Sequence, residues 1–452
     1  MIEPRGATTV VKGNRETCIL GAGVTGLAAA ATSGLTAFEA AAGPGGLCAS
    51  YYVQPGADQR LAAPPEDGQA YRFEIGGGHW IFGGAPLVRR CLRRLTPMKC
   101  HQRRAAVFFP ERKLHVPYPL QNHLSYLGSD LASKALQEIL SPPLGRPNTL
   151  AGWLEQTFGP TLTELFFKPF HQLYTAGLWT RIAPQDIYKS PIDPSAVMRG
   201  AFGHTEPVGY NASFVYPERG LDDLAARMAA ECRIHFDRRV ARVHVHRKEL
   251  EFENGSGAHY DVLLSTLPLN RMLSLTELEV GEEPDPSTSV LVLNIGALRG
   301  PECPDAHWIY VPHSRAGFHR VGFYSQVDPS FLPRSSDGRV SIYLERAYRD
   351  GHKPSPEQID QFARAAVEEL HAWHFIRDLE VLSPTWVDVA YTWSLPGSRW
   401  RARALKTLEE HDILMTGRFG KWEFQGIADS IQDGFLAGAA LRSSSRLAAG
   451  TC

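Results

Sequence analysis

The sequence lacks the features that would place it in several large classes of protein. Its 452 residues carry a formal net charge of −1, so no overall field would attract nucleic acid, and any anion-binding site must be local. No apolar run approaches the roughly 20 residues that a membrane-spanning helix needs. The N-terminus carries charges and has no apolar core, unlike a signal peptide. We therefore expect a cytoplasmic protein without membrane or nucleic-acid partners.

The cysteines show no pattern of metal or disulfide chemistry. All seven are scattered along the chain, and no two of them form a C-x-x-C pair. This spacing argues against a disulfide framework and against a zinc site. We therefore expect a reducing compartment and no bound metal. The length of the chain predicts two or three domains.

A short apolar strand followed by regularly spaced glycines is the strongest motif. Residues 18–20 precede Gly21, Gly23 and Gly26, which have the spacing G-x-G-x-x-G, and an alanine-rich run follows. The first glycine permits a tight turn, the second lets backbone approach a pyrophosphate, and the third lets a helix pack closely. Glu39 then stands where a carboxylate can accept hydrogen bonds from a ribose. This order predicts a dinucleotide-binding unit with a short helix, although small residues can also serve only to pack a helix on a sheet.

Two further glycine-rich segments point to the kind of dinucleotide. The pair Gly45-Gly46 follows Glu39 and resembles the G-G motif of FAD enzymes of the glutathione-reductase-like superfamily, with a surface turn as the alternative. Residues 76–84 set His79 and several apolar side chains among glycines, which favours a loop lying against a flavin over a plain surface loop. Because no second G-x-G-x-x-G follows a strand, we expect no separate nicotinamide-binding domain.

The rest of the chain shows two kinds of pattern. Residues 122–189 carry apolar residues at helical spacing, interrupted by prolines, which predicts a helical insertion. Between 290 and 344 short apolar segments recur as the strands of an antiparallel sheet would. Strands at 261–268 and 413–416 are expected to return the chain to the nucleotide-binding sheet. We therefore predict an α/β fold with a Rossmann-like FAD-binding domain (1–110, 205–275 and 385–452), a mostly helical domain (111–204) and an antiparallel β-sheet domain (276–384).

The segment Val116-Pro117-Tyr118-Pro119-Leu120-Gln121-Asn122 resembles the eukaryotic-type UDP-galactopyranose mutases and their bacterial relatives. Other matches cover nearly the whole chain, each modest alone, at 45–47, 77–82, 165–170, 179–182, 210–214, 307–310, 318–321 and 417–422. The wider relatives of that family are amine oxidases and protoporphyrinogen oxidases. The resemblance implies an FAD domain built from three chain segments, a helical domain, and a six-stranded type of antiparallel sheet.

The resemblance also implies an activity. In that family the enzyme interconverts the pyranose and furanose forms of UDP-galactose and needs reduced FAD. Flavin N5 attacks the anomeric carbon, UDP leaves, and the opened sugar closes again. The departing diphosphate needs cations beside it, and the planar fork of arginine suits phosphate oxygens. The implied partners are a nucleotide sugar or another anionic small molecule, and an external reductant such as NAD(P)H.

By position in these motifs, the resemblance assigns three sets of site residues. The catalytic set is His79, near flavin N5, with Arg181 and Arg320 at the diphosphate. The substrate-binding set is Phe82, Gln121, Asn211, Tyr310, Tyr391 and Phe424. The FAD-binding set is Gly21, Gly23, Gly26, Glu39, Gly45, Gly46, Leu47, Val240, Gly417 and Arg418. Surface ion pairs for the two arginines and core packing for Tyr310 are the competing interpretations.

Two departures from the patterns of related enzymes bear on the substrate. Phe424 stands where the mutases have a tyrosine, so a phosphate-binding hydroxyl worth about 1 kcal/mol or more is missing. Leu47 follows the glycine pair, where amine oxidases usually have arginine. Three hypotheses stay open: a mutase-like enzyme acting on a nucleotide sugar, an FAD oxidase or desaturase of the amine-oxidase or protoporphyrinogen-oxidase type, and a non-catalytic flavin-binding scaffold. Leu47, Arg181 and Arg320 favour the first.

Overall fold

A five-stranded parallel sheet holds the two ends of the nucleotide-binding region together. In the computed structural model, residues 17–185, 192–203, 212–336 and 338–449 are described. The strands lie in the order β10 (Arg233–His235), β2 (Thr36–Phe38), β1 (Cys18–Leu20), β14 (Leu263–Ser265) and β20 (Ile413–Met415), and all neighbouring pairs are parallel. The segments 261–268 and 413–416 therefore do return to this sheet, as expected. The sheet is built from parts of the chain that are far apart in sequence.

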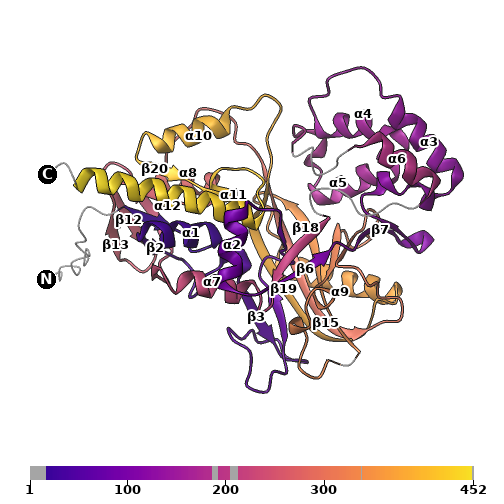
Figure 1. Cartoon of the computed structure of the whole chain (residues 1–452), viewed down its shortest axis with the longest axis horizontal. Coiled ribbons are helices and arrows are strands. Elements are labelled where there is room, and N and C mark those ends of the chain that lie inside the picture. Colours follow the sequence, from indigo (N-terminus) through magenta and orange to yellow (C-terminus); the bar gives the residue numbers. More distant parts are fainter. Residues whose placement is uncertain (1–16, 186–191, 204–211, 337, 450–452) are drawn as a thin grey trace.

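The first helix is short and packs closely against the last one. Helix α1 (Val24–Ser33) ends at Gly34, where φ is +75°, and it lies along α12 (Ile427–Ala449) (Figure 1). A Cβ at Gly434 would lie 2.2 Å from the carbonyl oxygen of Thr25. A Cβ at Gly438 would likewise lie 2.5 Å from the oxygen of Ala29. The small residues of α12 thus allow backbone-to-backbone contact that closes this domain.

A large sheet forms the second layer of the molecule. Its order is β19 (Ile376–Thr392), β15 (Ser287–Arg299), β18 (Arg339–Arg349), β17 (Arg320–Phe323), β16 (Trp308–Tyr310), β7 (Ala105–Phe109) and β8 (Leu114–Pro117). All neighbours are antiparallel except β16 and β7, which are parallel. The expectation of a six-stranded antiparallel sheet was wrong, because the sheet has seven strands and includes one parallel pair, β16 and β7. Strands β7 and β8 lie on either side of residue 110, the expected domain boundary.

One helix covers an apolar face of this sheet. Helix α9 (Pro356–Ala372) begins with a capping box, in which the Ser355 hydroxyl accepts from the Gln358 backbone and the Gln358 side chain accepts from Ser355. Phe362 and Leu370 are buried on its inner stripe, where they join the apolar side chains of β15 and β18 in one core cluster. Helix α9 therefore covers the apolar face of the large sheet.

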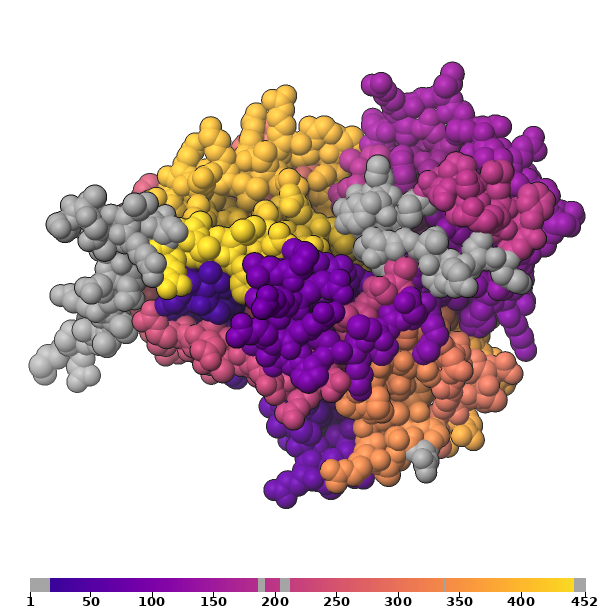
Figure 2. Space-filling model, viewed as in Figure 1, coloured from indigo at the N-terminus to yellow at the C-terminus, as the bar shows by residue number. Residues whose placement is uncertain are grey.

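The helical segment stands as a lobe beside the large sheet (Figure 2, magenta, upper right). It contains α3 (Ser129–Leu140), α4 (Leu150–Leu162), a π-helical turn (Thr163–Phe167), α5 (Lys168–Tyr174) and α6 (Pro194–Phe202). Pro142, Pro143 and Pro147 lie between α3 and α4, where they prevent one continuous helix. Aromatic and aliphatic side chains of α4 and α5 form the core of the lobe. Short 3-10 turns at 120–122, 124–127 and 178–180 connect it to the sheet.

Small elements join these layers. The strands are β3 (Ser50–Val53), β4 (Tyr71–Glu74), β5 (Ile81–Phe82), β6 (Met98–Gln102), β9 (Ser213–Pro217), β11 (Val240–His244), β12 (Glu249–Phe252) and β13 (Gly257–His259). The helices are α2 (Pro86–Leu95), α7 (Leu221–Ala229), α8 (Leu269–Thr276), α10 (Trp400–Glu409) and α11 (Gly417–Gly420), and 3-10 turns lie at 46–48, 110–112, 324–326 and 329–331. β4 pairs with β3, and β5 pairs with β9. The glycine-rich loop 75–80 thus connects β4 of one small sheet to β5 of another.

Within the described ranges, the helices are too short or too polar to cross a membrane. The same residues contain no group of three or more side chains that could hold a metal ion.

Candidate functional site

The glycine motif forms a cradle at the N-terminus of α1. Gly21 has φ of +96°, and a Cβ at Gly26 would lie 1.9 Å from the carbonyl oxygen of Gly21, so neither position tolerates a side chain. The space around the Cβ position of Gly23 is open to 4 Å. Gly45 closes the cradle by donating its N–H to the oxygen of Ala22 at 2.8 Å. Helix N–H groups facing open space fit a pyrophosphate.

Glu39 lies at the edge of this cradle, directly after β2. Its Oε2 accepts from the backbone N–H of Ala22 at 2.6 Å, and its Oε1 accepts from that of Ala41 at 2.8 Å. Arg238 donates its backbone N–H to the oxygen of Glu39 at 2.8 Å, which brings Val240 to the same edge. A cavity of about 1110 Å³ adjoins this edge at Ala40 and Val240, but most of its lining comes from residues 267–284, and Glu39 and the cradle glycines are not among its lining residues.

The loop between β4 and β5 lies flat on the large sheet. A Cβ at Gly78 would lie 2.5 Å from the hydroxyl of Tyr343 on β18, and Gly77 has φ of +79°. His79 donates its backbone N–H to Oε2 of Glu74 at 3.1 Å, and its Nδ1 lies 2.9 Å from the oxygen of Gly77. Burial lowers the pKa of His79, which keeps the imidazole neutral at physiological pH. The loop also touches Leu47, next to the second glycine pair.

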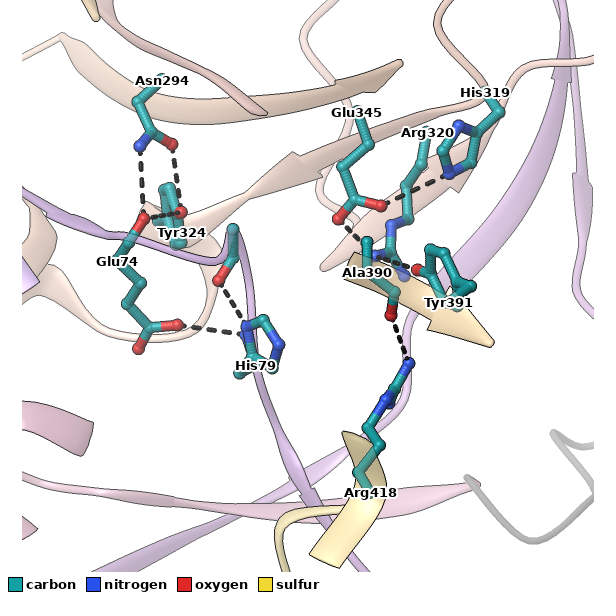
Figure 3. Close-up of polar contacts among 11 residues, drawn as sticks. Glu74, His79, Asn294, His319, Arg320, Tyr324, Glu345, Ala390, Tyr391 and Arg418 are labelled. Carbon is teal, nitrogen blue, oxygen red and sulfur yellow. Dashed lines mark hydrogen bonds and ion pairs between the residues drawn. The ribbon is translucent and has the colours of Figure 1, made fainter. Parts of the chain in front are cut away.

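Arg320 is held by a buried carboxylate on the neighbouring strand. Arg320 begins β17 and lies opposite Glu345 of β18 in the antiparallel register, and their side chains form an ion pair. The second oxygen of Glu345 lies 3.3 Å from Nε2 of His319. Burial acts to raise the pKa of Glu345, but Arg320 and His319 outweigh it and hold the pKa at about 2. Glu345 is therefore ionised, and it fixes the guanidinium (Figure 3).

Aromatic side chains surround this pair on the side of the helical lobe. The ring of Tyr310 lies 5.2 Å from that of Phe170 on α5. Tyr174, at the end of α5, packs 4.8 Å from Tyr391 and 5.2 Å from His319. The Tyr391 hydroxyl lies 3.5 Å from Nη2 of Arg320. The lobe, including its π-helical turn, thus contributes an aromatic wall to the site, consistent with the frequent placement of π-turns at functional sites.

A second arginine approaches from α11. Arg418 donates from Nη2 to the oxygen of Ala390 at 2.9 Å and from Nη1 to the oxygen of Gln425 at 3.1 Å. Its guanidinium lies 4.6 Å from the ring centre of Phe424 and 5.4 Å from that of Tyr391. Gly417, with φ of +75°, has no room for a Cβ against Thr25 of α1. Arg418 is therefore positioned between the cradle and the aromatic wall.

Not every expected site residue joins this cluster. Arg181 follows a 3-10 turn of the lobe, is 58% exposed, and forms its ion pair with Glu283 at 4.0 Å. The two arginines expected at the diphosphate thus have separate ion-pair partners, Glu283 for Arg181 and Glu345 for Arg320. Gln121 is buried, and Phe82 packs on Phe214 at 5.7 Å. Asn211 lies outside the described residues.

Several residues of the cluster were not predicted from the sequence. Glu345 and Tyr343 lie on β18 facing the glycine loop, Glu74 anchors His79, and Tyr174 lines the wall. The sequence did hold one signal for Glu345, which directly follows the apolar run 340–344. A charged residue in a buried strand is stable only with a partner, so its position indicated a buried ion pair.

Comparisons with known proteins agree with this architecture. The chain matches the protein family described as flavin-containing amine oxidoreductase over residues 25–440. It is similar to the crystal structure of a reduced UDP-galactopyranose mutase, with a TM-score of 0.82, 21% identity, and coverage of 95% of this chain and 96% of that one. It is also similar to a protoporphyrinogen oxidase-like protein from Exiguobacterium sp. 255-15 (TM-score 0.69, 15% identity, 96% and 99% covered). A third similar structure is putrescine oxidase with bound putrescine (TM-score 0.54, 15% identity, 95% and 99% covered). These identities show a shared fold.

Proposed function

The chain belongs to the flavin-containing amine oxidoreductase family, with FAD as its cofactor, and we propose that it is a mutase-like enzyme that isomerises a nucleotide-linked sugar. The observation that carries the proposal is Arg320. Its guanidinium is fixed by Glu345 beside an aromatic wall and the loop of His79. Its buried Nε has no hydrogen-bond partner among the described residues. A buried donor of this kind favours an anionic ligand as its partner.

The chain's own residues have distinct roles in this proposal. Arg320 binds the diphosphate and stabilises the charge that grows on it as the bond to the sugar breaks. Glu345 holds the guanidinium in one orientation, and the ring of Tyr310 supports the diphosphate. FAD, when bound and reduced, supplies the nucleophile for the anomeric carbon. Neutral His79 and its loop cover the flavin and exclude water from it.

A second candidate is an FAD oxidase or desaturase. The wall of Phe170, Tyr174, Tyr310 and Tyr391 is largely aromatic, and such a surface also suits an apolar or cationic substrate. Phe424 adds to it, since its ring faces Arg418 without a hydroxyl. Both candidates use the same cradle, so they differ in the substrate and in whether the flavin acts in its reduced form on a sugar or in its oxidised form as an electron acceptor.

One experiment separates the candidates. We would reduce the purified holoprotein anaerobically with dithionite and incubate it with a panel of UDP-hexoses and other nucleotide hexoses, including UDP-galactopyranose. New isomers detected by chromatography, lost on Arg320→Lys but retained on Arg346→Ala, would support the mutase. Arg346 is the matched control, because it follows Glu345 on β18 and instead contacts Ala316 and Phe362. Bleaching of the oxidised flavin by an amine or a porphyrinogen-type substrate, without isomers, would support the oxidase.

A further inference from the structure

A buried carboxyl group lies next to the loop of His79, and the proposed reaction uses it only as an anchor of that loop. Glu74 ends β4 and is fully buried. Its Oε1 accepts from the hydroxyl of Tyr216 at 2.6 Å, and its Oε2 accepts from the backbone N–H of His79 at 3.1 Å. Its carbonyl oxygen accepts from Asn294 at 3.3 Å and from Tyr324 at 3.4 Å. Figure 3 shows the carboxyl group pointing at His79 from the side away from Arg320 and Arg418.

The charged groups around Glu74 do not neutralise the negative charge of its carboxylate. Both groups that donate to its carboxyl are neutral. The nearest cation, buried Arg72, pairs with Asp222 at 3.6 Å and donates to the Tyr216 hydroxyl and the oxygen of Arg219, each at 3.0 Å. Among the described residues no cation lies within ion-pair distance of Glu74. A buried carboxylate without its own counter-ion is costly, and the usual remedy is to bind a proton.

We propose that Glu74 is a redox-linked proton-binding site, which takes up a proton when the flavin is reduced. Reduction adds negative charge to the cofactor above the loop of His79. That charge acts through a loop that packs on buried Tyr343 of the large sheet, where electrostatic interactions are stronger than in water. A carboxylate hydrogen-bonded directly to the backbone of the loop would then be even less stable as an anion. The electrons come from the external reductant and the proton comes from solvent, so charge and atoms balance.

The surroundings fix the pH range in which this site acts. Burial raises the pKa of Glu74 to about 8, against opposing effects from Tyr216, Arg72 and the His79 backbone. The titratable groups that face it are Arg72 on β4, Tyr216 on β9, Asp222 on α7, Cys48 in the 3-10 turn at 46–48, Tyr324 after β17, Tyr343 on β18 and His79 in the loop. Burial raises the pKa of Cys48 and of these tyrosines and lowers that of His79. Glu74 is therefore the group expected to change charge between pH 7 and 9.

The test is the pH dependence of the flavin midpoint potential in the holoprotein. Below about pH 7, Glu74 is protonated in both redox states, so wild type and Glu74→Gln should have equal slopes. Above about pH 8, reduction of the wild type should take up an additional proton. Its slope should then exceed that of Glu74→Gln by up to about 30 mV per pH unit, the value for one proton in a two-electron couple. A pH-indicator dye should record the same additional proton during reduction by dithionite.

Two further variants keep the test decisive. Tyr216→Phe removes one hydrogen-bond donor to the carboxylate, so the pH at which the slope of the midpoint potential changes should rise. This variant can still be measured if Glu74→Gln binds FAD poorly. Glu369→Gln is the matched control, since Glu369 on α9 instead accepts the backbone N–H groups of Arg315 and Ala316 in the segment before β17, and it should leave the slope unchanged. Equal slopes for wild type and Glu74→Gln from pH 6 to 9.5, or a change of slope at the same pH in Tyr216→Phe as in the wild type, would overturn the inference. The inference about Glu74 requires bound FAD and not the mutase activity, so a negative result in the nucleotide-sugar assay would not contradict it.

Discussion

Replacing Arg320 by alanine should destabilise the fold as well as the site, because Arg320 balances a buried carboxylate. Glu345 is 3% exposed, and its pKa is about 2 against an ordinary value of 4.5. That difference corresponds to about 3 kcal/mol of stability at neutral pH. Breaking a buried ion pair from one side typically costs about 3–5 kcal/mol. We therefore expect Arg320→Ala to lower the free energy of unfolding by about 3 kcal/mol or slightly more at pH 7.

The effect should depend on pH in a direction that the structure fixes. In the wild type the folded-state pKa of Glu345 lies below its unfolded value. The contribution of the pair is therefore present above about pH 4.5 and is lost as the pH falls toward 2. Without Arg320, burial acts on Glu345 with only His319 opposing it, so the pKa rises above its ordinary value. The variant should then regain stability as the pH falls from 7 toward 4.5, and its gap to the wild type should narrow.

The test is to measure the free energy of unfolding of four proteins in urea between pH 4.5 and 8, at a fixed excess of FAD. They are the wild type, Arg320→Ala, Glu345→Gln and the double variant. The double variant removes the uncompensated charge, so it should recover most of the lost stability at pH 7 while remaining inactive. A loss of stability in Arg320→Ala that is the same at every pH would refute the argument, as would a double variant no more stable than the single one.

Three more outcomes are expected. Gly26→Ala should abolish FAD binding, measured by flavin absorbance after gel filtration, because its Cβ would lie 1.9 Å from the Gly21 oxygen; a yellow variant would contradict this. Glu39→Ala should weaken FAD affinity by roughly tenfold or more in a fluorescence titration, since the carboxylate orders the cradle by two backbone hydrogen bonds. Phe424→Tyr should tighten the binding of UDP by about 1 kcal/mol in calorimetry if the mutase proposal holds, and an unchanged affinity would favour the oxidase.

Local sequence patterns predicted the cradle well. The strand, the glycine turn and the helix at 18–33 are consecutive, so the spacing of Gly21, Gly23 and Gly26 alone indicates their geometry. The strands at 261–268 and 413–416 were also predictable, because buried apolar segments that end at a turn are typical of a parallel sheet. The antiparallel strands between 287 and 349 followed from their apolar segments in the same way.

Contacts set by strand pairing between distant segments were not predictable. Arg320 and Glu345 meet because β17 and β18 pair in a register that no local pattern specifies. Strands β7 and β8 join the large sheet because β7 pairs in parallel with β16 across about 200 residues of sequence. The proton site at Glu74 likewise depends on Tyr216, which reaches it from β9. The direction of an exposed side chain such as Arg181 is set by solvent and by Glu283, not by its motif.

The charge balance of the site bears on which function is right. Arg320 and Arg418 contribute two positive charges and Glu345 one negative charge, while His79 is neutral, which leaves the cluster with a net charge of +1. A nucleotide diphosphate carries about two negative charges, so the mutase proposal needs one more cation when substrate binds. Arg181 suits that need, because its guanidinium is 58% exposed and its ion pair with Glu283 spans 4.0 Å at the surface, where such a pair is worth about 0–1 kcal/mol. An oxidase acting on a neutral or cationic substrate makes no such demand on Arg181. The two functions therefore differ in whether the lobe must bring this arginine to Arg320.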